Sequence, residues 1–185
     1  MKWIAAFFSQ TGSEILNIIN ATGVVPEVII SNRLRDDGTI RNVGMINKEL
    51  LDRFESRIVY IPNRPSVEDY KRVLGNSEKG LISLHGYLRI LPPEICDSYE
   101  VVNLHPGLIT KYPFLKGKDP QEKAYGLQLD TSGAVIHKVT AEVDSGEILD
   151  SVEIPIKGLS LDEVYENLHK CSSELWIKFF KEHIL

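Results

Sequence analysis

The sequence opens with a strand pattern that passes directly into a helix pattern, in "WIAAFFSQTGSEILNII" (residues 3–19). Its first six residues are apolar throughout, as expected of a strand that is buried on both faces of a parallel sheet. Gly12 then marks a turn, after which Ile15, Ile18 and Ile19 recur at helical spacing. A buried strand followed at once by a helix is the building unit of α/β folds, so this stretch predicts that fold class.

The same alternation continues along most of the chain. Further strands are predicted at 26–32, 57–62, 80–86 and 100–105, and further helices at 47–54, 66–76 and 92–99, with a polar loop at 35–42. Beyond a long loop at 106–120 the pattern changes to two strands, at 133–140 and 147–156, whose short connection predicts an antiparallel pair at the sheet edge. A last helix is predicted from about residue 160, with Val164, Leu168, Leu175 and Phe179 on its inner side. We therefore expect one domain, residues 1–185, with an open, mostly parallel, Rossmann-like sheet and helices on both faces.

Composition limits the classes of partner. The net charge of −5 argues against nucleic acid as the main partner, because its backbone attracts basic surfaces. Cys96 and Cys171 belong to no metal-binding or disulfide pattern, so no metal site is predicted and a reducing cytoplasm is expected. The apolar start is too short to span a membrane and lacks a cleavage pattern. The sequence leaves open whether the protein is a monomer or a homodimer.

Two loops that follow predicted strands are candidates for ligand binding, since open parallel sheets bind ligands beyond the carboxyl ends of their strands. In "SQTGSE" (9–14), Gly12 precedes a helix whose first N–H groups can face an anion, although an ordinary turn capped by Ser13 explains the same residues. In "GYLRIL" (86–91), the apolar residues can wall a flat ring while Arg89 contacts an anion, although core packing is the simpler reading.

The predicted strand at 100–105 ends in Asn103 and His105, one residue apart. Alternate residues of a strand point to the same face, so an amide and an imidazole lie together at the strand end. This pair suits a reaction that develops an oxyanion and moves a proton, whereas a lone histidine is more often structural.

The connection at 141–146 adds an acid to this site. If it folds over the strand end, Asp144 can orient His105 and raise its pKa. His137 on the preceding strand can add a second donor, or can be a buried histidine of an edge strand. His85, His169 and His183 lack such context and are predicted to be structural.

Taken together, four segments resemble the folate-dependent formyltransferases of the glycinamide ribonucleotide transformylase family. They are "SQTGSEI" (9–15), "GYLRIL" (86–91), "NLHPGLITKYPF" (103–114) and "HKVTAEVDSG" (137–146), and the resemblance extends over almost the whole chain. The combination of Asn-x-His-Pro with a distant aspartate is its most specific part.

The resemblance implies formyl transfer from the co-substrate 10-formyltetrahydrofolate to a small-molecule primary amine. It implies that Asn103 and His105 stabilise the tetrahedral oxyanion, while Asp144 holds the imidazolium form or relays protons through water. It implies folate contacts at Leu88, Arg89, Ile90, Leu91, His137, Thr140, Ala141 and Val143. It implies acceptor contacts at Thr11, Gly12, Ser13, Glu14, Pro106 and Gly107.

The sequence departs from the family pattern on the acceptor side. Glu14 stands where the family usually has asparagine, Gly107 where it has serine, and Ser172 where a glutamate contacts the ribose. The family's phosphate-contacting arginine aligns with Val67, although Arg64 is near in sequence.

These departures keep the acceptor open. Glycinamide ribonucleotide, the substrate of a purine-biosynthesis step, is the family's default acceptor. Another amine, such as an aminosugar nucleotide, is the alternative. Hydrolysis of 10-formyltetrahydrofolate, with water as the acceptor, is a third possibility. A binding module without activity is disfavoured because Asn103, His105 and Asp144 are all present.

Overall fold

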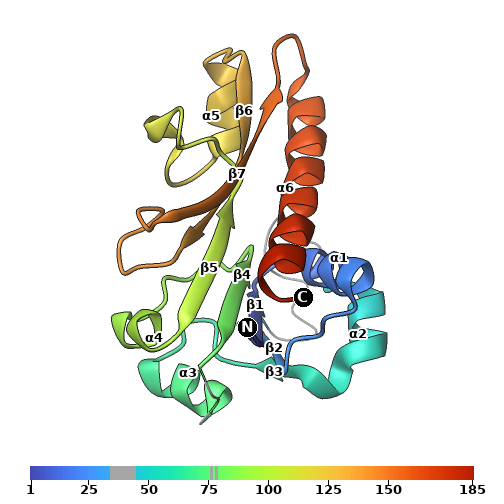
Figure 1. Cartoon of the computed structure of the whole chain (residues 1–185), viewed down its shortest axis with the longest axis vertical. Helices are drawn as coiled ribbons and strands as arrows, with labels where there is room; N and C mark the ends of the chain where they lie inside the picture. The colour runs from blue at the N-terminus through green and yellow to red at the C-terminus, as the bar shows by residue number, and fades with distance from the viewer. Residues whose placement is uncertain (34–44, 76, 78) are drawn as a thin grey trace.

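A seven-stranded sheet forms the centre of the computed structural model, which describes residues 1–33, 45–75, 77 and 79–185. The strand order is β3-β2-β1-β4-β5-β6-β7 (Figure 1). The parallel strands are β1 (Trp3–Phe8), β2 (Val28–Ser31), β3 (Ile58–Tyr60), β4 (Leu81–His85) and β5 (Glu100–His105). The predicted α/β fold is confirmed, whereas the loop predicted at 35–42 lies outside the described residues.

The antiparallel pair at the sheet edge is also confirmed. β6 (Thr131–Lys138) runs antiparallel to β5, with Asn103 opposite His137 and His105 opposite Val135. β7 (Ile148–Pro155) continues the sheet beyond β6. Because β6 returns alongside β5, His137 is brought beside Asn103, and the connection after β6 can fold back over the strand end.

Helices cover both faces of the sheet, as predicted. They are α1 (Ser13–Thr22), α2 (Lys48–Phe54), α3 (Val67–Leu74), α4 (Pro93–Ser98), α5 (Pro120–Gly126) and α6 (Leu161–His183), with 3-10 turns η1 (Glu55–Arg57) and η2 (Pro113–Leu115). α5 and η2 lie in or beside the segment predicted as a long loop. η2 buries only Leu115, and α5 buries only Pro120 and Ala124, so neither shows the apolar stripe by which the other helices are predicted.

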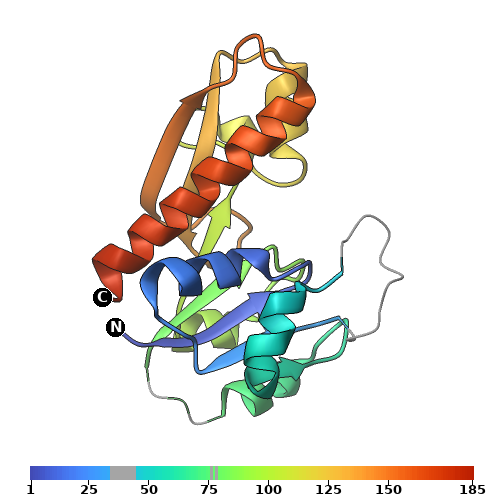
Figure 2. The ribbon, with the colours of Figure 1, turned by 90° about the vertical axis from the view of Figure 1, so that its right-hand side faces the viewer.

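The core is divided by the sheet. On one face α1, α2 and α6 pack through an apolar cluster that includes Trp176 and Phe180, and α6 lies along the strands (Figure 2). On the other face α3 and α4 pack through a cluster that includes Tyr70 and Ile95. The four α6 residues predicted to face inward are buried. Within the described residues, no helix is both long and apolar enough to cross a membrane.

Candidate active site

Asp144 lies against the His105 imidazole, so the predicted convergence of residues some forty positions apart is present. Asp144 Oδ2 is 3.3 Å from His105 Nδ1 and accepts a hydrogen bond from the Gly117 N–H at 2.9 Å. Both side chains are almost fully buried, with exposed fractions of 6% for His105 and 9% for Asp144. The turn reaches this place because Asp144 adopts a left-handed backbone conformation, with φ 52°.

His137 and Asn103 complete the group on the same face of the sheet. His137 Nε2 is 3.5 Å from Asp144 Oδ1 and 3.4 Å from the Asn103 amide nitrogen. Its Nδ1 lies 2.9 Å from the Lys138 carbonyl oxygen and donates to it, which leaves Nε2 toward the amide and the acid. His137 therefore lies in the cluster, as the first of its two predicted roles requires, and it is also buried. We refer to Asn103, His105, His137 and Asp144 as the polar cluster.

Burial determines how this cluster holds its protons. Burial lowers the pKa of His105 and outweighs the Asp144 carboxylate and the Leu115 carbonyl, which act to raise it. Asp144 therefore acts on the pKa of His105 in the expected, raising direction, while burial sets the net direction. Burial acts to raise the pKa of Asp144, but contacts from His137, the Gly117 N–H and His105 outweigh it and lower that pKa. The result is an ionised acid beside an imidazole that holds its second proton weakly.

The segment between β5 and α5 covers the cluster. The Leu115 carbonyl oxygen lies 2.7 Å from His105 Nε2, so both ring nitrogens face oxygen atoms. Gly107 also lies close to the ring: a Cβ there would meet Pro120 at 2.8 Å and His105 Nε2 at 3.1 Å. Glycine at this position is therefore explained by local packing, since a larger side chain would push against the imidazole.

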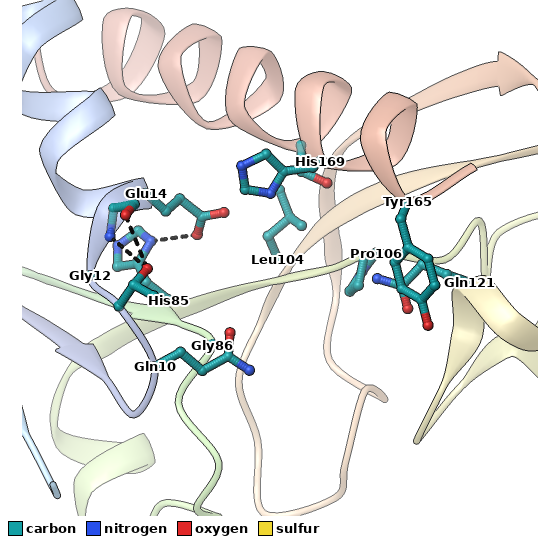
Figure 3. Close-up of a pocket in the computed structure, with 13 residues that line it drawn as sticks. Gln10, Gly12, Glu14, His85, Gly86, Leu104, Pro106, Gln121, Tyr165 and His169 are labelled. Atoms are coloured by element: carbon teal, nitrogen blue, oxygen red, sulfur yellow. Dashed lines mark hydrogen bonds and ion pairs between the residues drawn. The ribbon is translucent and has the colours of Figure 1, made fainter. Parts of the chain in front are cut away.

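The first loop places a carboxylate at the start of α1. Gly12, not Ser13, is the N-cap of the helix, with φ 73°, and a Cβ there would meet the Leu50 side chain at 2.5 Å. Glu14 Oε1 lies 2.7 Å from Nδ1 of the buried His85 (Figure 3). His85 is buried, as predicted for a structural residue, but it also fixes Glu14.

A cavity of about 300 Å³ opens beside this pair, between the first loop and α6. Glu14, His85 and Gln10 gather at one end, and Tyr165, Gln121 and Pro106 at the other (Figure 3). Leu104 and Pro106 line the cavity, while Asn103 and His105 point to the other face of β5. The cavity and the polar cluster thus lie on opposite sides of the carboxyl end of β5 and alternate along the chain there. Of the six acceptor contacts that the resemblance implies, Gly107 alone does not line the cavity.

The segment after β4, residues 86–91, presents exposed apolar side chains. β4 is the neighbour of β5 in the sheet, so this segment follows the strand next to the one that carries Asn103 and His105. Leu88 and Ile90 are exposed by 53% and 68%, and Val143 in the connection after β6 by 52%, so they are available to a ligand. Thr140 and Ala141 are also exposed. Leu91, in contrast, is buried in the core, so the folate contact predicted for it can involve only its backbone.

Hydrogen bonds fix this segment to the neighbouring strand ends. The buried Ser9 hydroxyl accepts from the Leu88 N–H at 2.9 Å and donates to Asn32 at 2.6 Å. Arg89 donates to the Asn63 carbonyl and side-chain oxygens, both at 2.7 Å. The Arg89 guanidinium, predicted to contact an anion, is thus engaged in fixing the loops.

Some of the cavity residues were missed by sequence reasoning. Tyr165 and His169 reach the cavity from α6 and Gln121 reaches it from α5, and His169 had been assigned a structural role. Tyr165, His169 and Ser172 recur at i, i+4 and i+7, so they form a polar stripe beside the apolar stripe of α6. That helical spacing of polar residues is the sequence pattern from which a second functional face of α6 could have been predicted.

Comparisons with known proteins show the family of the chain. Residues 4–179 match the family model described as formyl transferase. The chain belongs to the formyl transferase family. Members of this family are folate-dependent N-formyltransferases whose formyl donor is 10-formyltetrahydrofolate.

Individual relatives of this formyl transferase differ in their acceptors. A phosphoribosylglycinamide formyltransferase of Haemophilus influenzae is 28% identical, with 98% of this chain and 88% of the relative covered. A methionyl-tRNA formyltransferase of Campylobacter jejuni is 29% identical over 68% of this chain, but only 40% of that protein is covered. The structure of a phosphoribosylglycinamide formyltransferase from Streptococcus pneumoniae, 25% identical, superposes with a TM-score of 0.77, covering all of both chains.

Proposed function

We propose that this formyl transferase moves a formyl group from 10-formyltetrahydrofolate to the primary amine of a small acceptor bound in the cavity. The observation that carries the proposal is the polar cluster itself, in which an amide, two imidazoles and an ionised acid meet at the end of β5, next in the chain to the cavity residues Leu104 and Pro106. The names of several relatives make glycinamide ribonucleotide the default acceptor. A different amine is the alternative, because Glu14 introduces a negative charge into the cavity.

The chemistry requires one bond to form and one to break at the formyl carbon. The acceptor nitrogen attacks that carbon, the carbonyl oxygen becomes an oxyanion, and the bond to the folate nitrogen then breaks while a proton passes from the amine to that nitrogen. The Asn103 amide is suited to donate to the oxyanion. His105 is suited to carry the proton, since its lowered pKa makes it release a second proton readily.

Asp144 acts on the reaction through the His105 imidazole. Its carboxylate faces His105 Nδ1, so it stabilises the positive charge that appears whenever the ring carries two protons. The bond from the Gly117 N–H holds the acid in this position. Of the two roles considered for Asp144, the lowered pKa of His105 favours proton relay over a permanent imidazolium.

The exposed apolar residues Leu88, Ile90 and Val143 supply a surface for the flat pterin ring of the donor.

The substrate can reach the His105 imidazole only after one contact opens. His105 Nε2 contacts the Leu115 carbonyl, so that contact must open before Nε2 can reach the substrate. Positioning both substrates over the end of β5 supplies a large part of the rate, on the order of 7–11 kcal/mol in well-oriented systems.

A three-way assay separates the alternatives. Purified protein is given 10-formyltetrahydrofolate with and without a panel of amines that includes glycinamide ribonucleotide, and both the deformylated folate and the N-formyl amine are measured. A transferase forms both products only when an amine is present, a hydrolase releases folate and formate without one, and a binding module forms neither. Amine-independent release, or no product with any amine, would refute the proposal.

The roles within the cluster are tested by His105→Ala. Loss of the proton carrier should reduce turnover by at least about a hundredfold while folate binding is retained. Unimpaired turnover in this variant would remove His105 from the mechanism.

A further inference from the structure

The cavity that receives the acceptor is negatively charged at the end farther from Pro106. Glu14 supplies a carboxylate there, and its side chain remains 25% exposed while it contacts His85. Among the described residues that line the cavity, there is no lysine and no arginine. An anionic group on the acceptor would therefore meet a like charge with no described cation in the cavity wall to offset it.

The network behind Glu14 keeps that charge in place. The Trp3 indole donates to the Ser83 hydroxyl at 2.8 Å, and that hydroxyl lies 2.7 Å from His85 Nε2. If the hydroxyl donates to Nε2, His85 Nδ1 carries the proton and donates it to Glu14, and every polar atom in the chain of contacts has a partner. With either placement of the hydrogens, His85 Nδ1 faces Glu14, so this contact holds the Glu14 side chain at the cavity wall.

Arg33 and Arg64 do not supply a cation to the described cavity wall. Arg33 donates Nη1 to the Gln10 carbonyl from behind the first loop, and its side chain does not line the cavity. Val67 begins α3, which packs on the opposite face of the sheet, and neither it nor Arg64 lines the cavity. The described cavity wall therefore has no cationic side chain for a phosphate, and Glu14 places a carboxylate beside the N–H groups at the start of α1 that could otherwise face an anion.

The rest of the wall is suited to hydroxyl groups. Gln10 and Gln121 present amide donors and acceptors, and His169 adds an imidazole. The Tyr165 hydroxyl donates to Glu122 at 2.9 Å and can still accept. The Ser172 side chain also lines the cavity and is only 4% exposed, and its hydroxyl has no oxygen or nitrogen partner among the described residues, with the weakly polar Cys171 sulfur nearby. A buried hydroxyl without a partner is uncommon, so its position at the cavity wall points to a ligand group that satisfies it.

The size of the cavity limits what can occupy it. Its volume of about 300 Å³ is at the lower end of small-molecule sites, which span roughly 300–1,000 Å³. A monosaccharide-sized amine fits this space, whereas a sugar nucleotide needs more. The amine would lie at the Pro106 end, near the polar cluster, and the hydroxyl groups at the Glu14 end (Figure 3).

We infer that the acceptor is an unphosphorylated amine of about monosaccharide size whose hydroxyl groups contact Glu14 and Ser172. The inference rests on the proposed formyl transfer and narrows its acceptor. It departs from glycinamide ribonucleotide, which carries a phosphate, and from an aminosugar nucleotide, which carries more than one.

The test compares amines in matched pairs that differ only in a phosphate. Glucosamine is compared with glucosamine 6-phosphate, and glycinamide riboside with glycinamide ribonucleotide. For each amine, the dissociation constant is measured by calorimetry and kcat/KM by formation of the N-formyl product. In at least one pair, the unphosphorylated amine should bind about tenfold more tightly or better and have the higher kcat/KM. Inorganic phosphate at about 10 mM, enough to occupy a weak phosphate site, should not compete with it.

Two variants link the preference to Glu14. Glu14→Gln keeps the shape and the contact with His85 but removes the charge, so it should reduce the preference about tenfold within each pair. Glu166→Gln removes an exposed charge on α6 that does not line the cavity, so it should leave the preference unchanged. The comparison within the unmodified protein remains valid even if Glu14→Gln fails to fold.

The outcomes are distinct. Preference for the phosphorylated members, no binding by either member of both pairs, or an unchanged preference in a folded Glu14→Gln protein would overturn the inference. If the unphosphorylated amines bind preferentially but no N-formyl product forms, the assignment of the cavity stands and the proposed formyl transfer fails.

Discussion

Replacing Asp144 with asparagine tests the cluster with little change in shape. Asparagine tolerates the left-handed backbone that Asp144 adopts, with φ 52°, whereas alanine would add strain to the loss of charge. Its side-chain oxygen can still accept from the Gly117 N–H. Asp144→Asn therefore removes the charge beside His105 and leaves the turn in place.

The expected loss follows from the distance between the acid and the ring. With Asp144 Oδ2 at 3.3 Å from His105 Nδ1, the attraction of unit charges is about 5 kcal/mol at an effective dielectric constant of about 20. The asparagine dipole retains part of it. If about half is lost when the imidazolium forms, turnover falls by about a hundredfold, which corresponds to about 2.7 kcal/mol.

The assay measures kcat, folate affinity and the pH dependence of kcat/KM together. Folate affinity should change little, and the acidic limb of the profile should move to lower pH, because Asp144 acts to raise the pKa of His105 and its removal lowers that pKa further. Asp52→Asn, an exposed acid on α2, is the matched control and should behave as the unmodified protein. A kcat within about threefold of the unmodified protein, or an unmoved acidic limb, would refute this account of the cluster.

Three further predictions concern stability and packing. The folded protein holds the pKa of His105 below its unfolded value of about 6.5. Acidification from about pH 7.5 through that unfolded value should therefore lower the free energy of unfolding, because the unfolded chain binds the proton more tightly. Urea titrations of His105→Gln should show a weaker pH dependence of that free energy than the unmodified protein. Gly107→Ser should cost about 1–3 kcal/mol in urea titrations, because the new Cβ meets Pro120 at 2.8 Å, whereas Gly126→Ser, with no atom within 4 Å, should cost less than about 1 kcal/mol. Gly12→Ala forces a residue with Cβ into a conformation with φ 73° and a close contact, so its thermal midpoint should fall by several degrees; an unchanged midpoint would contradict the strained-turn assignment.

Local patterns predicted most of the architecture. The apolar run at 3–8 predicted β1, because a strand buried on both faces is apolar throughout. The helical spacing of Ile15, Ile18 and Ile19 predicted α1, because a helix buried on one face repeats its apolar residues at that spacing. The same reasoning predicted the later strands and the inward face of α6. It failed at α5, whose buried residues are only Pro120 and Ala124, so no apolar stripe marks the helix.

The parts of the site that lie within one strand were predictable from the sequence, and the contacts between distant segments were less so. Asn103 and His105 share a face of β5 because of the two-residue period of a strand, and that was evident from sequence. The approach of Asp144 was suggested by a turn and by resemblance, but the turn alone allowed other placements. The contact between Leu115 and His105 had no sequence signal, since it involves a backbone carbonyl.

The sequence by itself determined the strand and helix order, the shared face of Asn103 and His105, and membership in a family whose motifs are spread over the whole chain. Tertiary structure decided the charge balance of the two sites. Burial lowers the pKa of His105 despite the adjacent acid, and the pairing of Glu14 with His85 leaves a carboxylate in the cavity. The physical reason is that desolvation and charge pairing depend on which atoms surround a group in space, and residues such as Glu14 and His85, 71 positions apart, become neighbours only when the sheet forms.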